Sequence, residues 1–140
     1  MELIERALGE YGTMEIPGST DNPEILKYFH EIGHDWVEHE ETAWCSAYVN
    51  WVAKVCGYEH SGALDARSWL KKGSVVLDFK LGDVAIFWRE SPDSWRGHVG
   101  FPIRRDGDSV WVLGGNQNNM VRITPYPYNR LLGYRRLNKI

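Results

Sequence analysis

The sequence has no excess of basic residues. Its 16 Lys and Arg are outnumbered by 19 Asp and Glu, which leaves a net charge of −3. Basic residues are scattered, apart from pairs such as Arg104-Arg105 and Arg135-Arg136. A protein that binds nucleic acid needs a coherent basic surface. The composition therefore argues against a nucleic-acid partner.

Long apolar runs are also missing. The N-terminal stretch Met1-Glu2-Leu3-Ile4-Glu5-Arg6 contains acidic residues, and no later segment has the length of a signal peptide core or a membrane span. We therefore expect no membrane insertion and synthesis in the cytoplasm without a signal peptide. If the substrate lies outside the cytoplasm, release or another protein must deliver the chain to it.

Cysteine is scarce, because only Cys45 and Cys56 are present. If residues 43–56 form one helix, the two Cα atoms lie roughly 16 Å apart along its axis. A disulfide requires Cα atoms within about 7 Å, so this pair is not expected to form one. Cys56 beside Gly57 fits a small core residue, and Cys45 remains to be explained.

The sequence contains no internal repeat and no low-complexity tract, and 140 residues predict a single domain over 1–140. Apolar residues recur at three- and four-residue spacing in the first half and at strand-like spacing from residue 75. Helices are predicted over 2–11, 23–32, 43–56 and 64–71, and Thr42 can cap the third. Short strands are predicted over 75–77, 83–88, 98–104, 109–113, 120–123 and 132–135. This order predicts an α+β fold with N-terminal helices packed on an antiparallel sheet of five to six strands.

Cys45 falls in the first turn of the third predicted helix, where unpaired backbone N–H groups and the helix dipole favour a thiolate. His98 lies on a predicted strand some fifty residues later. Together they form a candidate nucleophile and base, with His98 also expected to lower the pKa of the thiol below its free value of about 8.5.

The hairpin around Arg105-Asp106-Gly107 bears on a third catalytic residue. A three-residue loop would pair Arg104 with Asp108 and place Asn116 on the face of His98. A two-residue Asp106-Gly107 loop would place Gln117 there instead. We favour Asn116, because Gly107 suits the last position of a three-residue loop, and keep Gln117 as the alternative.

A competing motif, His30-Glu31-Ile32-Gly33-His34, matches the H-E-x-x-H pattern of zinc peptidases. Zinc binding would need both histidines on one face of a continuous helix. Gly33 and the polar residues after it predict instead that the helix ends here. A zinc metallopeptidase is therefore the alternative enzyme, and the favoured site needs no metal and no cofactor.

Five motifs, taken in order, resemble the small bacterial and phage cysteine hydrolases of the CHAP and NlpC-type group. They are Thr-Ala-Trp-Cys-Ser-Ala-Tyr-Val-Asn-Trp-Val at 42–52, Ala-Arg-Ser-Trp-Leu at 66–70, Gly-Asp-Val at 82–84, Gly-His-Val-Gly-Phe at 97–101 and Leu-Gly-Gly-Asn-Gln at 113–117. The resemblance implies a papain-like fold and hydrolysis of an amide bond in peptidoglycan. It also implies that Cys45 is the nucleophile and His98 the base, whereas the third residue varies in type across the group.

This resemblance suggests a phage lysin or a delivered antibacterial effector that acts on the cell wall as a monomer. Its substrate would be peptidoglycan stem peptides, and an immunity or inhibitor protein is a possible partner. Arg67 can offer a planar fork to a carboxylate, and tryptophans can offer stacking faces. The substrate-binding candidates are Trp44, Arg67, Trp69 and Trp95. A catalytically silent peptidoglycan-binding module is the non-enzymatic alternative.

Overall fold

The computed structural model describes residues 2–15, 22–34 and 44–140. Its helices are α1 (Glu2–Gly9), α2 (Pro23–His30) and α3 (Cys45–Val55), with 3-10 helices at η1 (Ala66–Lys71) and η2 (Tyr128–Arg130). The strands are β1 (Ser74–Val76), β2 (Val84–Trp88), β3 (Gly97–Asp106), β4 (Ser109–Gln117), β5 (Met120–Pro127) and β6 (Leu131–Arg136). Among the described residues, no helix is long and apolar enough to cross a membrane.

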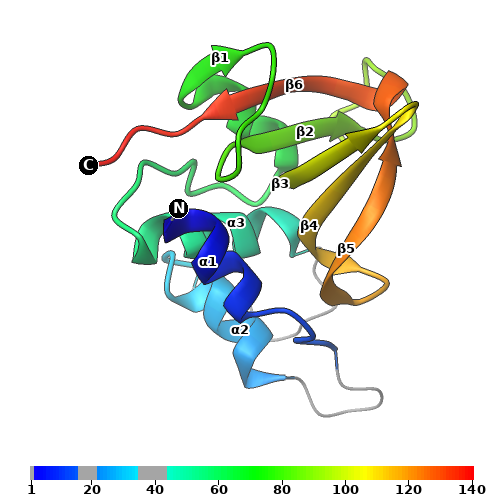
Figure 1. Ribbon diagram of the computed structural model, residues 1–140. Coiled ribbons are helices and arrows are strands. Elements are labelled where there is room, and N and C mark those ends of the chain that lie inside the picture. The colour runs from blue at the N-terminus through cyan, green and yellow to red at the C-terminus, as the bar shows by residue number, and fades with distance from the viewer. Residues whose placement is uncertain (1, 16–21, 35–43) are drawn as a thin grey trace.

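The six strands form one sheet in the order β1-β6-β2-β3-β4-β5, and every neighbouring pair is antiparallel. Helix α3 packs against β3 and β4, and α1 and α2 pack against α3 (Figure 1). The predicted α+β class, with N-terminal helices on an antiparallel sheet of five to six strands, is confirmed. The fourth predicted helix is a 3-10 helix, and Thr42 lies outside the described residues.

Helix α3 is the centre of the core, because nine of its eleven residues are buried. Its apolar side chains join those of α1, α2 and the sheet in one buried cluster. Two of the buried residues are polar. Ser46 Oγ donates to the carbonyl of Ala63 at 2.7 Å and accepts from Trp69 Nε1, while Asn50 Oδ1 accepts from the backbone N–H of Gly62. These bonds fix α3 to η1 and to the loop before it, since a buried polar group without a partner is costly.

The start of β2 and the end of β6 are joined by a buried carboxylate. Asp83 Oδ1 and Oδ2 accept from Arg136 at 2.9 and 2.8 Å, and Oδ2 also accepts from the backbone N–H of Lys80. This bidentate pairing directs the Asp83 side chain to β6 and to its own loop.

Asp83→Asn is expected to lower the melting temperature by roughly 5 °C or more, because it removes the charge from a buried, fully bonded carboxylate. Asp106→Asn is the matched control. Asp106 faces Arg104 at 3.7 Å with both side chains exposed, so its loss should shift the melting temperature by less than about 2 °C. Thermal unfolding followed by circular dichroism tests the pair, and equal shifts would contradict a structural role for Asp83.

Candidate active site

Cys45 lies in the first turn of α3, as predicted, and is the first residue of this helix. Cys45 is 6% exposed. Trp44 is the N-cap residue, and its side chain makes no capping hydrogen bond. The thiol lies beside the backbone N–H of Val99, the residue that follows His98 on β3. The packing of α3 on β3 thus brings Cys45 next to the strand that carries His98.

Gln117 holds the His98 ring. Its Oε1 lies 2.8 Å from His98 Nε2, and its Nε2 donates to the carbonyls of Val112 at 3.0 Å and Arg122 at 2.7 Å. Because both amide hydrogens go to carbonyls, the amide oxygen must face the histidine. Oε1 only accepts, so His98 Nε2 carries the proton and the lone pair of the neutral ring is on Nδ1.

We favoured Asn116 as the third residue, and this prediction was wrong. The amide that bonds His98 is that of Gln117, the alternative. Asn116 lines the same pocket, but its side chain makes no hydrogen bond with another described residue. The β3–β4 turn is neither of the two predicted loops, since Asp106 pairs with Ser109 and the register shifts between Pro102 and Arg104. A second bulge between Gly114 and Gln117, with Asn116 at φ 59°, then brings Gln117 to the face of His98.

Gly114 lies directly against this hydrogen bond. A Cβ on Gly114 would lie 2.5 Å from Gln117 Oε1 and 3.2 Å from His98 Nε2. On the other side of the strand, a Cβ on Gly115 would lie 2.7 Å from the Trp44 ring. The Gly-Gly pair therefore lets β4 approach His98 with one residue and α3 with the next.

Burial governs the proton affinities of the pair. It raises the pKa of the Cys45 thiol above its ordinary value, although the N–H groups of Val99 and Ser46 and the charge of Arg89 act the other way. Burial also lowers the pKa of His98 to about 4. The charge of Arg89 lowers this pKa further, whereas the hydrogen bond to Gln117 raises it. The expectation of a thiol pKa below its free value was wrong, because desolvation outweighs the helix N-terminus. The resting pair is a thiol and a neutral imidazole.

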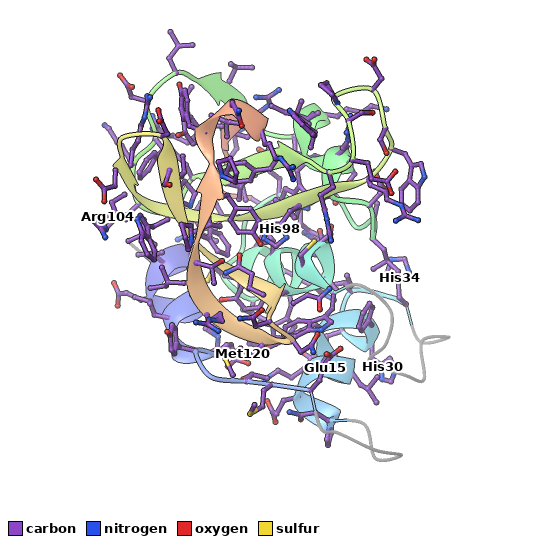
Figure 2. All side chains as sticks on the ribbon, turned by 90° about the vertical axis from the view of Figure 1, so that its right-hand side faces the viewer. Glu15, His30, His34, His98, Arg104 and Met120 are labelled. Carbon is purple, nitrogen blue, oxygen red and sulfur yellow. The ribbon has the colours of Figure 1, made fainter. Side chains whose placement is uncertain are left out.

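Aromatic rings cover the histidine. Tyr126 stacks on His98 with the ring centroids 4.5 Å apart and the planes 13° apart, and Phe87 also stacks with Tyr126 at 5.2 Å. His98 is 3% exposed, and it appears near the middle of the molecule in Figure 2. This stack keeps water from the ring and accounts for the direction of its pKa shift.

Three of the four substrate-binding candidates are structural. Trp44 and Trp69 are fully buried. Arg67 donates to three backbone carbonyls, at 2.9 Å to Arg96, 2.7 Å to Pro92 and 3.0 Å to Ser91, so its fork holds the loop before β3. Trp95 in that loop is 71% exposed and stays a candidate for substrate contact.

The zinc-like motif does not have the required geometry. Helix α2 ends at His30, Gly33 has φ 96°, and His34 Nε2 lies 2.8 Å from the carbonyl of Gly62. Glu31 accepts from Trp51 Nε1 at 2.9 Å. In Figure 2 both histidines lie at the edge of the molecule, away from His98. Within 2–15, 22–34 and 44–140, no three His, Cys, Asp or Glu side chains gather as a metal site.

No family model matches the chain, and no curated protein does. Among solved structures, the chain is similar to a protein from Staphylococcus aureus subsp. aureus Mu50 described as similar to lipoprotein, NLP/P60 family. The two share 16% identity with a TM-score of 0.49 over 96% of this chain and 40% of the other. This chain thus spans less than half the length of that protein.

Gln117→Ala should release the His98 ring, whereas Asn116→Gly should leave it fixed. Glycine suits the positive φ at position 116, so the control removes the amide and retains the bulge. Nitrogen chemical shifts of the His98 ring measure the tautomer directly. We expect the Nε2–H form in the wild type and in Asn116→Gly, and a mixture in Gln117→Ala. The reverse order would reinstate Asn116 as the partner.

The buried neutral His98 also predicts a pH dependence of stability. Its folded pKa is about 4 and its ordinary value is 6.5, so between these values the unfolded chain binds more protons. The free energy of unfolding should therefore fall as the pH drops from about 6.5 to about 4, by on the order of 2–3 kcal/mol from this group. Urea unfolding at several pH values tests this against His98→Gln, which should lack that part of the slope. Parallel curves for the two proteins would refute it.

Proposed function

We propose that the protein is a cysteine hydrolase that cleaves an amide bond in peptidoglycan. The observation that carries the proposal is the Gln117–His98 hydrogen bond, which leaves the basic Nδ1 of a neutral imidazole on a strand packed against the helix start that bears Cys45. A thiol, a base and a group that orients the base are the parts of a nucleophilic acyl-transfer site.

In the proposed mechanism, His98 Nδ1 removes the Cys45 proton as the sulfur attacks the amide carbon, because the resting thiol is protonated. Cys45 is the first helical residue, so its backbone N–H has no acceptor within the helix and is suited to the developing oxyanion. The imidazolium then protonates the leaving amine. Water activated by His98 hydrolyses the acyl-enzyme and restores the thiol.

The substrate class rests on the motifs between residues 42 and 136 that resemble CHAP and NlpC-type hydrolases. The proposal covers an endopeptidase or an amidase that acts on the wall as a monomer, as a phage lysin or as a delivered effector. The exposed Trp95, in the loop that leads into the strand of His98, suits contact with stem peptide or glycan. The zinc peptidase has no comparable support, because α2 ends at the first residue of its motif, His30.

Loss of turbidity of purified cell walls tests the proposal. Cys45→Ala and His98→Ala should each lower the rate at least about 100-fold, while Cys56→Ala, the matched cysteine control, should keep it. Full activity of Cys45→Ala would rule out cysteine catalysis.

The same assay separates the two alternatives. Loss of activity on chelation together with loss in His34→Ala would favour the zinc peptidase. A wild type that binds walls but lyses none of several wall types would favour a binding module. Mass spectrometry of fragments released from defined muropeptides then identifies the bond that is cut.

A further inference from the structure

A pocket of about 570 Å³ opens beside His98 and Gln117, and its composition is unusual for this protein. Three arginines line it, Arg89, Arg122 and Arg130, and none of the described residues that line it is acidic. The chain as a whole carries a net charge of −3. A cationic pocket in an acidic protein indicates an anionic ligand, because the pocket concentrates positive potential where the rest of the surface does not.

The three arginines are not neutralised by any described residue. Every ion pair within 2–15, 22–34 and 44–140 lies elsewhere, between Lys27 and Glu10 or Glu24, Arg96 and Glu90, Arg104 and Asp106, and Arg136 and Asp83. Arg130 packs over the Trp88 ring at 4.8 Å, which holds its guanidinium at the pocket. Arg122 is half-buried, and its carbonyl accepts from the same Gln117 amide that orients His98.

We propose that these arginines bind a free carboxylate of the substrate, so that the enzyme prefers wall peptides with a carboxylate near the scissile bond over peptides in which it is amidated. This specificity rests on the proposed function, since the pocket shares His98 with the candidate site. The planar guanidinium matches a carboxylate with two parallel hydrogen bonds. The amides of Asn116 and Asn118, which also line the pocket, add neutral polar contacts.

The charge distribution favours a peptide carboxylate over a polyanion. A nucleic acid or another polyphosphate would need a basic surface that continues beyond the pocket, whereas acidic residues outnumber basic ones in this chain. A single carboxylate needs only the pocket. Exposed contacts of this kind weaken as salt rises above about 0.15 M, where the screening length is about 8 Å.

Hydrolysis of a synthetic stem tetrapeptide with free carboxylates, compared with its carboxamide form, tests the specificity. The wild type should show a kcat/KM at least about tenfold higher for the free form, the effect expected of one charge-assisted hydrogen bond. Arg122→Gln should lower kcat/KM for the free form to near that of the carboxamide. Arg104→Gln is the control, because it removes the same charge from an exposed side chain far from His98 (Figure 2).

Binding to the Cys45→Ala protein separates this inference from the proposed function. Calorimetry should find the free-carboxylate peptide bound at least about tenfold more tightly than the carboxamide peptide, and Arg122→Gln in the same background should remove the difference. That result supports the inference even if no peptide is hydrolysed. Equal binding of the two peptides would overturn it. Inorganic phosphate that competes as well as the acidic peptide would also overturn it, because the pocket would then be a simple anion site.

Discussion

The structure depends on the burial of α3 between the N-terminal helices and strands β3 and β4. Nine buried residues in eleven leave this helix almost no contact with water. Its polar side chains must therefore bond inside the protein, and Ser46 and Asn50 do so through Trp69, Ala63 and Gly62. Strand β4 must also come close to the helix, which requires glycine at position 115, because a Cβ there would lie 2.7 Å from the Trp44 ring. The helix start that bears Cys45 is fixed by these contacts.

The same burial determines the state of the candidate catalytic pair. In water, a helix N-terminus beside a thiol favours the thiolate. Here the thiol and the imidazole both lose solvent. The cost of charging the thiol exceeds its gain from the backbone N–H groups, and the cost of charging the imidazole exceeds its gain from the Gln117 hydrogen bond. A neutral pair is thus the stable resting form, and in the proposed mechanism charge would develop on both groups during the reaction. An oriented acceptor such as Gln117 matters more in this setting, because it stabilises the imidazolium without adding a charge of its own.

Much of the fold followed from sequence periodicity. The change from helical to strand-like spacing near residue 75 separated the helices from the sheet, and Gly33 predicted that the helix ends within the zinc-like motif. Cys45 at the start of a helix and His98 on a strand followed from local patterns alone. Those features are short-range, because a cap, a period or a left-handed glycine acts within a few residues.

Local patterns could not identify the third catalytic residue. The face of the sheet on which its side chain lies depends on the sum of several register shifts. The turn at Gly107 sets the starting register. The irregularity between Pro102 and Arg104 and the bulge before Gln117 then each shift the pairing by one residue, and a shift of one residue reverses the face. Gly114 lies against His98. The left-handed conformation of Asn116, two residues later, interrupts the alternation of faces along the strand. An asparagine after two glycines was the available signal, since asparagine tolerates positive φ better than most residues.

The roles of the aromatic and arginine residues could not be predicted from the sequence, for a different reason. A tryptophan or an arginine has the same propensity whether it packs inside or faces a ligand, so only the tertiary contacts distinguish Arg67, which binds three carbonyls, from Arg122 in the pocket. Burial decides the same question for Trp69 and Trp95.

The charge of Arg89 shows how a cationic pocket is compatible with a buried neutral pair. This charge lowers the pKa of Cys45, which favours the thiolate, and lowers the pKa of His98, which disfavours the imidazolium. Proton transfer from sulfur to Nδ1 forms both ions together, and the pair has no net charge. The effect of Arg89 on the thiolate therefore opposes its effect on the imidazolium when the proton is transferred. An anion bound beside Arg89 would act on the two ions with opposite signs in the same way. Under the proposed mechanism, the arginines of the pocket would bind a ligand with little change in the proton transfer, and the choice of substrate would be separate from the proposed chemistry on Cys45.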